Sequence, residues 1–339
     1  MALLLAGAGM LVATAAAVSL LMALPAAALA EAAGESNAAG RARVWLAALL
    51  VPPLAGLAAA IRALLLYAQG LGATPHLGGL RPHLCLLPMV NAPAGAFALR
   101  ALAWLSLLLI AAAVLRVAAG AISGHLLRRM MIDSGAPLDP ADAQGPPVLA
   151  VELRRPVSFT AGLLRPVIVI STALSGRLAP EELRAIIGHE RAHARRRDNL
   201  LALLADGCAT LLLLVPTAWY ARRRLRAAIE QAADDEAVVR GVAPEALVGA
   251  LRAVESAANG VPRAPTLAAL LIPEPAEPAQ RRARLQGEAP ARSAADGRAH
   301  ALVATAVGVV LIAVLLLAAR QPIEDSLFCA AEQLIAAVR

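Results

Sequence analysis

The chain of 339 residues is 59% hydrophobic but only 2% aromatic, so Ala, Leu and Val supply most of its apolar content. This composition is typical of membrane proteins and argues against a soluble enzyme. The net charge is +7, and all 31 basic residues are arginine, a preference over lysine that we attribute to coding bias. We therefore expect no direct nucleic-acid partner. Three scattered cysteines exclude a disulfide framework.

Four segments are apolar enough to cross a bilayer, which requires about 20 residues per helix. They are residues 3–30, 44–68, 98–122 and 300–319. The first ends in an Ala-Leu-Ala that fits a signal-peptidase site, but it lacks a basic start, so we favour a retained anchor. We expect three transmembrane helices in residues 1–124, a fourth at 299–319 and a short extracytoplasmic tail at 320–339.

Arginines flanking these segments predict their orientation, because positive charge favours the cytoplasmic side. Arg128 and Arg129 follow the third segment, and five more precede the fourth: Arg281, Arg282, Arg284, Arg292 and Arg298. We therefore place residues 125–298 in the cytoplasm, the loop 31–43 inside, and the N-terminus and loop 69–97 outside. The predicted location is the inner cell membrane, with several spans and lipid contact.

The region 125–298 has the pattern of a small α+β domain. Residues 133–147 are dense in Pro, Gly and Asp and predict a loop. Short β-branched runs at 148–153 and 166–171 predict a small antiparallel sheet. Pro180, followed by two glutamates, predicts the start of a helix that continues to about Arg197.

That helix contains the most informative motif, His189-Glu190-Arg191-Ala192-His193. Histidines four residues apart on a helix point to one side and can hold one Zn²⁺. Glu190 lies beside them, where its carboxylate can take a proton from the attacking water. A solvated, charged helix surface is the plain alternative, but the helical context favours a metal site.

Zinc held by two histidines needs a third protein ligand and an open position. Glu230 is our choice, and Asp234, on the same helical face, can accept the free ring N–H of a ligand histidine. Asp235 and Glu236 remain alternatives for the third ligand. A single crossing by the apolar run 199–220 would put Glu230 on the wrong side of the bilayer. We therefore predict a membrane-associated hairpin there, re-entrant, interfacial or buried in protein.

Three stretches resemble the bla-regulator-type (BlaR/MecR-like) membrane metallopeptidases, which are related to HtpX and Ste-type proteases. They read SFTAGLLRPVIVIS, APEELRAIIGHERAHARRRDN and RRRLRAAIEQAADDEAV. The resemblance implies a gluzincin (zincin-like) fold in which HExxH is His189 to His193 and ExxxD is Glu230 and Asp234. It also implies a substrate-binding edge strand, assigned here to Val167, Ile168, Val169 and Ile170.

Two departures from that family limit the resemblance. Ala233 stands where members often have cysteine, and the chain ends about 20 residues after the fourth apolar segment, without the penicillin-binding domain of beta-lactam receptors. Direct antibiotic sensing is therefore unsupported.

The sequence predicts a multi-spanning α-helical membrane protein with an inserted α+β gluzincin metallopeptidase domain. We expect a zinc-dependent endopeptidase that hydrolyses a protein or peptide, with a transcriptional repressor among the candidate substrates. One alternative is a non-catalytic signalling or scaffold protein that keeps a structural metal. Another is a transporter that uses the charges of Arg62, Arg100 and Asp206, but it leaves the HExxH helix unexplained.

Overall fold

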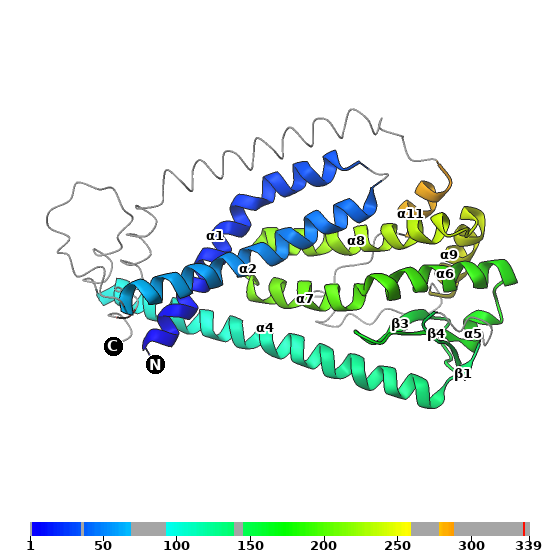
Figure 1. Cartoon of the computed structure of the whole chain (residues 1–339), viewed down its shortest axis with the longest axis horizontal. Helices are drawn as coiled ribbons and strands as arrows, with labels where there is room; N and C mark the ends of the chain where they lie inside the picture. The colour runs from blue at the N-terminus through cyan, green and yellow to red at the C-terminus, as the bar shows by residue number, and fades with distance from the viewer. Residues whose placement is uncertain are drawn as a thin grey trace.

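The computed structural model describes residues 2–34, 37–68, 93–138, 145–258, 278–287 and 335. The described part is elongated, with long apolar helices at the end that holds the N-terminus and a small sheet at the opposite end (Figure 1). The fourth apolar segment predicted at 300–319, all of the tail except residue 335, and most of the loop 69–97 lie outside the described residues.

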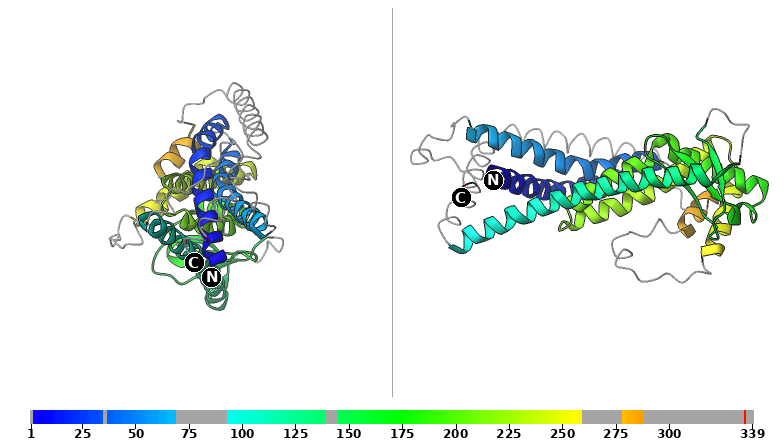
Figure 2. Two further views of the ribbon diagram at one scale, coloured as in Figure 1. Left: turned by 90° about the vertical axis from the view of Figure 1, so that its left-hand side faces the viewer. Right: turned by 90° about the horizontal axis from the view of Figure 1, so that it is seen from below.

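Among the described residues, three helices are long and apolar enough to cross a membrane: α1 (Ala2–Ala32), α2 (Ala38–Ala68) and α4 (Pro93–Ser134). They confirm the prediction of a membrane protein. Helix α4 extends well beyond the apolar stretch at 98–122 and runs along most of the molecule until it reaches the sheet (Figure 2). Large side chains such as Leu24 and Leu115 are 82% and 68% exposed, as expected for lipid-facing positions.

Helices α7 (Asp198–Leu211) and α8 (Pro216–Val239) form a helical hairpin packed against α1, α2 and α4. The chain reverses over residues 212–215, within the region where the sequence predicts a hairpin. Buried Trp45, Leu212 and Leu225 belong to the cluster that joins the hairpin to α2. Helix α8 therefore returns toward the HExxH helix, while the hairpin's association with the membrane stays a prediction.

The sheet has four strands in the order β1-β2-β4-β3: β1 (Ala136–Pro137), β2 (Val148–Val151), β3 (Ser158–Ala161) and β4 (Val167–Ser171). The prediction of an antiparallel sheet from the runs at 148–153 and 166–171 is wrong for these two strands, because β2 and β4 pair in parallel. Only β1 and β3 pair antiparallel with their neighbours.

The prediction that Val167 to Ile170 form a substrate-binding edge is also wrong. Strand β4 lies between β2 and β3, and all four of these side chains are fully buried. The side chains of Ile168 and Ile170 pack in the cluster that includes α6, whereas Val167 and Val169 pack with Met131 of α4. Burial on both faces explains the continuous β-branched run, which is typical of a central strand rather than an edge. The outer strand on this side is β3.

Four further helices complete the described fold: α5 (Thr172–Ser175), α6 (Pro180–Arg196), α9 (Pro244–Ala258) and α11 (Pro278–Leu285). Helix α6 begins at Pro180 as predicted, and the Glu182 carboxylate accepts a 2.9 Å hydrogen bond from the Ala179 N–H. It ends at Arg196, and the next residue, Arg197, has a left-handed φ of 54° and leads at once into α7. Because the chain passes from α6 to α7 through this one residue, the Asp198 side chain lies beside the last turn of α6.

Candidate metal centre

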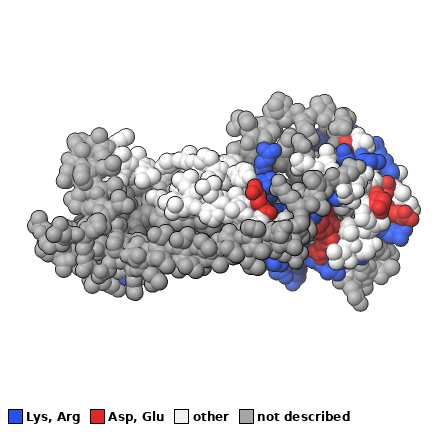
Figure 3. Space-filling view, turned by 90° about the horizontal axis from the view of Figure 1, so that it is seen from above, with Lys and Arg blue, Asp and Glu red and all other residues white. Residues whose placement is uncertain are grey.

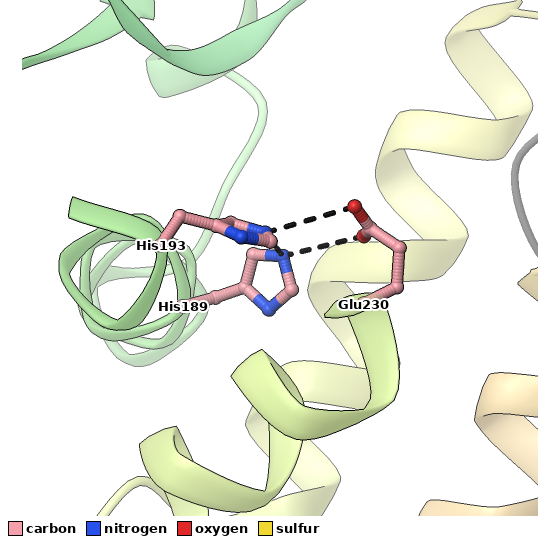
Figure 4. Close-up of side chains that lie close together, drawn as sticks. All are labelled: His189, His193 and Glu230. Atoms are coloured by element: carbon pink, nitrogen blue, oxygen red, sulfur yellow. Dashed lines mark hydrogen bonds and ion pairs between the residues drawn. The ribbon is translucent and has the colours of Figure 1, made fainter. Parts of the chain in front are cut away.

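The two histidines of α6 and Glu230 of α8 meet across the gap between these helices (Figure 4). The Nε2 atoms of His189 and His193 are 3.0 Å apart. The Glu230 carboxylate oxygens lie 3.6 Å from Nε2 of His189 and 3.7 Å from Nε2 of His193. In a tetrahedral zinc site, bond lengths of 2.0–2.1 Å put ligand atoms about 3.3 Å from one another. The spacing of these three donor groups therefore fits one zinc ion.

Carboxylates hold the other nitrogen of each histidine ring. Nδ1 of His193 lies 2.8 Å from Asp198 Oδ2, and Nδ1 of His189 lies 2.9 Å from Asp234 Oδ1. The second contact is at ion-pair distance but falls short of a well-aligned hydrogen bond. An acceptor at Nδ1 favours the tautomer whose Nε2 lone pair is available to a metal.

Asp198 was missed by the sequence analysis, although Asp234 was not. It is the fifth residue after His193, beyond the end of α6, so helical spacing alone does not bring it to the ring. The left-handed backbone of Arg197 turns Asp198 back toward His193, and the Asp198 side chain is buried. The signal available in the sequence was an aspartate directly after an arginine run that ends the helix.

The two alternative third ligands are engaged elsewhere. Glu236 pairs with Arg195 at 2.8 Å, and Asp235 pairs with Arg284 at 2.6 Å. Glu230 is the acidic residue of this stretch that lies beside both histidine Nε2 atoms.

Glu190 is buried at 6% exposure, next to the histidines on α6. The Thr160 hydroxyl of strand β3 lies 2.9 Å from its Oε2, where it can donate a hydrogen bond. The Asn199 side-chain amide in turn donates to the Thr160 carbonyl oxygen at 2.6 Å. Strand β3 is thus tied to both α6 and α7, and the Glu190 carboxylate is held facing the same cavity as the histidines.

Arg281 of α11 is a site residue that the sequence analysis could not assign. Its Nε and Nη2 donate to the Asp234 carboxylate at 2.8 and 2.7 Å, and its Nη1 lies 3.0 Å from Glu230 Oε2. It is 8% exposed, so it faces the protein rather than lipid. Bidentate pairing of this kind fixes geometry as well as charge.

These contacts shift the protonation of the centre. Burial by itself lowers the pKa of His189, but the contacts with Asp234 and Glu230 outweigh it and raise the pKa to about 9. Burial by itself raises the pKa of the Glu230 carboxyl, yet His189 and Arg281 hold that pKa well below its usual range. Without a metal, His189 therefore keeps a proton that an incoming cation must displace.

A cavity of about 580 Å³ lies in front of the centre. Ser158, Phe159 and Thr160 of the outer strand β3 line one part of it. Apolar side chains from α6, α8 and α9 line another part: Ile186, Ile229, Leu247, Leu251 and Val254. The candidate catalytic and metal-binding groups thus share one cavity with an outer strand and an apolar wall.

Comparisons with known proteins find similarity to membrane peptidases. Residues 99–246 match the family model described as BlaR1 peptidase M56. A protease HtpX homolog of Moorella thermoacetica is 37% identical over 73 residues, which cover 21% of this chain and 24% of that protein. The protease HtpX homolog 2 of Methanosarcina acetivorans is 29% identical over 77 residues, covering 22% of this chain and 26% of the relative.

The chain thus spans about a quarter of the length of these curated relatives. No solved structure matches it. The resemblance inferred from the sequence is nevertheless confirmed, and over residues 99–246 the chain is similar to the BlaR-like membrane metallopeptidases.

Proposed function

We propose that this protein is a zinc-dependent endopeptidase that hydrolyses a protein substrate at the cytoplasmic face of the inner membrane. The observation that carries the proposal is the meeting of His189, His193 and Glu230, with Glu190 beside them, in a cavity that also reaches a strand edge. Within the described residues, three side chains form the group that could hold a metal ion, which leaves one position of a tetrahedral zinc for water or substrate. An open coordination position is typical of catalytic rather than structural zinc, which argues against the scaffold alternative.

Substrate would bind in an extended form along β3. This strand pairs with β4 on one side, and its other side has no strand partner among the described residues. An extended peptide can add to such an edge through main-chain hydrogen bonds. Because Thr160 of β3 contacts Glu190, a peptide bound there would pass close to the metal centre. Strand β3 thus takes the role that the sequence analysis assigned to Val167–Ile170.

Each side chain of the centre has a chemical role in this proposal. When bound, zinc would polarise the scissile carbonyl and acidify a water molecule. Glu190 would take the proton from the attacking water and pass it to the leaving amine, while Thr160 holds its carboxylate in place. Asp198 and Asp234 would keep the histidine rings in the ligating tautomer, and Arg281 would position Glu230.

The cytoplasmic location rests on the arginine distribution and on the fold. Helix α2 begins with a turn that carries Arg41 and Arg43, and the Arg41 guanidinium donates to the side chain of Gln231, the residue after Glu230, so this end of α2 lies near the metal centre. Positive charge next to a span favours the cytoplasmic side. A cytoplasmic or membrane-proximal protein, a transcriptional repressor among them, is therefore the proposed substrate class.

Glu190→Gln tests the proposal directly, because it removes the base and keeps the size of the side chain. We expect the variant to retain one zinc per chain and to lose proteolysis by about 10² to 10⁴-fold. Membrane and cytosolic proteomes of cells with wild-type or variant protein would be compared for fragments that disappear. Glu181→Gln is the matched control, since Glu181 is exposed at the start of the same helix. Unchanged fragments with Glu190→Gln would refute the proposed activity.

A further inference from the structure

Arg226 of α8 lines the cavity in front of the metal centre, and the proposed mechanism gives it no role. It lies four residues before Glu230, so the two side chains project from one face of the helix. The other titratable side chains of this lining all serve the metal centre: His189, Glu190, His193, Asp198, Glu230 and Arg281. Arg226 thus borders the catalytic cavity without belonging to the centre itself.

The acid that pairs with Arg226 has no capacity for its remaining donors. Nη2 of Arg226 donates to both carboxylate oxygens of Asp206, at 3.0 Å each. Nε of Arg222 donates to Asp206 Oδ1 at 2.6 Å, and Nη2 of Arg116 donates to Oδ2 at 3.2 Å. A carboxylate accepts at about four lone-pair sites, which these contacts fill. Asp206 therefore holds one nitrogen of the Arg226 guanidinium in place and leaves its Nε and Nη1 to other acceptors.

The Nε and Nη1 atoms of Arg226 have no hydrogen-bond partner within the part of the chain that the structure describes. Nε is buried, whereas the side chain as a whole is 30% exposed and lines the cavity. A guanidinium stays protonated and carries five N–H donors. Unpaired donors in a partly buried cationic group are unfavourable, so an acceptor that enters the cavity gains a prepared partner.

Arg226 lies on the side of the metal centre that faces the helical hairpin. Its ion pair with Asp206 attaches it to α7, which follows the His193 end of α6, whereas α9 and the sheet lie toward the opposite end (Figure 1). On the face seen in Figure 3, charged side chains gather at the sheet end, and the described surface toward the other end is almost free of charge. Arg226 therefore adds a positive charge to the side of the cavity that faces the less charged end of the molecule.

We propose that Arg226 recognises an acidic side chain, aspartate or glutamate, of the peptide substrate. This inference rests on the proposed endopeptidase function and narrows its substrate class. Pairing of a guanidinium with a carboxylate is charge-assisted and directional, and Asp206 fixes the guanidinium before substrate arrives. Arg226 and Glu230 are about 6 Å apart along the helix axis, and an extended peptide advances about 3.3 Å per residue. The acidic residue should therefore lie about two residues from the scissile bond.

Peptide binding is measured first with the full, zinc-loaded chain that carries Glu190→Gln, so that the result does not depend on proteolysis. A random heptapeptide library with acetylated and amidated ends is incubated with the protein in neutral detergent, and retained peptides are identified by mass spectrometry. We expect peptides with Asp or Glu to be retained about tenfold better than those with Asn or Gln in the same place. Arg226→Gln should abolish this preference, whereas Arg226→Lys should keep part of it, because lysine keeps the charge.

Arg116→Gln is the matched control, because Arg116 also pairs with Asp206 but lies outside the cavity lining. This variant weakens the same group of charges and should keep the preference for acidic peptides. A thermal unfolding curve for each variant identifies any misfolded protein. The absence of an acidic preference in the Glu190→Gln chain, or its equal loss in Arg116→Gln and Arg226→Gln, would overturn the proposal.

Cleavage of the same library by the chain with Glu190 intact separates this inference from the proposed function. We expect products whose acidic residue lies about two positions from the new terminus. Cleavage without an acidic preference would overturn the role of Arg226 and leave the endopeptidase activity standing. Retention of acidic peptides without any cleavage would support recognition by Arg226 and refute the endopeptidase activity.

Discussion

The helices at the apolar end pack through small side chains, whereas the elements around the metal centre are joined by buried charge pairs. A Cβ added to Gly56 of α2 would lie 2.3 Å from the Leu11 carbonyl oxygen of α1, so these two backbones nearly touch. At the other end, Asp234 pairs with Arg281, and Asp198 with His193. The difference follows from the surroundings, because helices in lipid associate through close packing, whereas a cofactor site requires charges held in place.

The two kinds of packing meet at Asp206 of α7. Its carboxylate lies 3.2 Å from Arg116 of α4, 2.6 Å from Arg222 of α8 and 3.0 Å from Arg226 of α8. This group of charges connects the longest apolar helix to the hairpin that carries Glu230. The charges singled out in the sequence as signs of a transporter include Asp206, and here that carboxylate binds three arginines between helices. These ion pairs explain the presence of Asp206 structurally, without a transport function.

Asp206→Asn should have the largest effect on stability. Asp206 pairs with three arginines, and one of them, Arg222, is 4% exposed, so loss of the carboxylate charge breaks up a buried charge group, which costs about 3–5 kcal/mol. Thermal unfolding in detergent micelles measures the loss. Asp133→Asn, at an exposed position near the end of α4, is the control. A shift no larger than that of the control would mean that the charge group does not hold the hairpin to α4.

The affinity for zinc should rise steeply with pH. In the metal-free protein the pKa of His189 is raised to about 9, so zinc competes with a proton below that pH, and its affinity should increase by about tenfold per pH unit from 7 to 9. The stability of the metal-free protein should change with pH in the opposite direction. Its stabilisation by protonated His189 is complete below the unfolded pKa of about 6.5 and is lost as the pH rises through 9.

Melting temperatures of zinc-loaded and chelator-treated protein, recorded between pH 6 and 9, test both expected pH dependences in one experiment. The gap between the two temperatures should widen as the pH rises. A constant gap would mean that His189 binds no proton that zinc displaces.

Asp198→Asn should weaken zinc binding by about 10 to 100-fold without unfolding the chain, because the amide no longer enforces the ligating tautomer of His193. Competition with a metal chelator of known affinity measures the change. Glu181→Gln, on the exposed first turn of α6, should bind zinc as the wild type does. If both variants bind zinc equally well, Asp198 has no part in positioning the ring.

Gly56→Ala tests the apolar end. The added methyl group would meet backbone atoms of α1 rather than a movable side-chain end, so we expect a loss of about 1–3 kcal/mol in stability. Gly124→Ala in α4 is the matched control, since its nearest neighbour, Leu163 Cγ, is 3.9 Å away. Replacing a helical glycine by alanine in open space is neutral or stabilising. Equal unfolding temperatures for the two variants would show that α1 and α2 are not held at this distance.

The amino-acid sequence by itself determined the parts of this protein that depend on local pattern. Apolar length predicted the three membrane helices, and the Pro180 start with HExxH spacing predicted α6 and its paired histidines. The approach of Glu230 to the histidines could also be anticipated, because a candidate metal site needs ligands from both stretches and the reversal at 212–215 allows them to meet. Periodicity and ligand chemistry are properties of short stretches, so they can be read without knowing the fold.

Only the tertiary structure decided which strand is outermost and which distant groups reach the centre. The continuous β-branched run Val167–Ile170 is typical of a strand buried on both faces, but it does not say which strands flank it, so the order β1-β2-β4-β3 could not be inferred from it. Asp198 depends on the left-handed turn at Arg197, and Arg281 comes from a helix separated by about 50 residues from Asp234. Contacts of this kind depend on how α6, α8 and α11 pack, and no repeating pattern in the sequence records that packing.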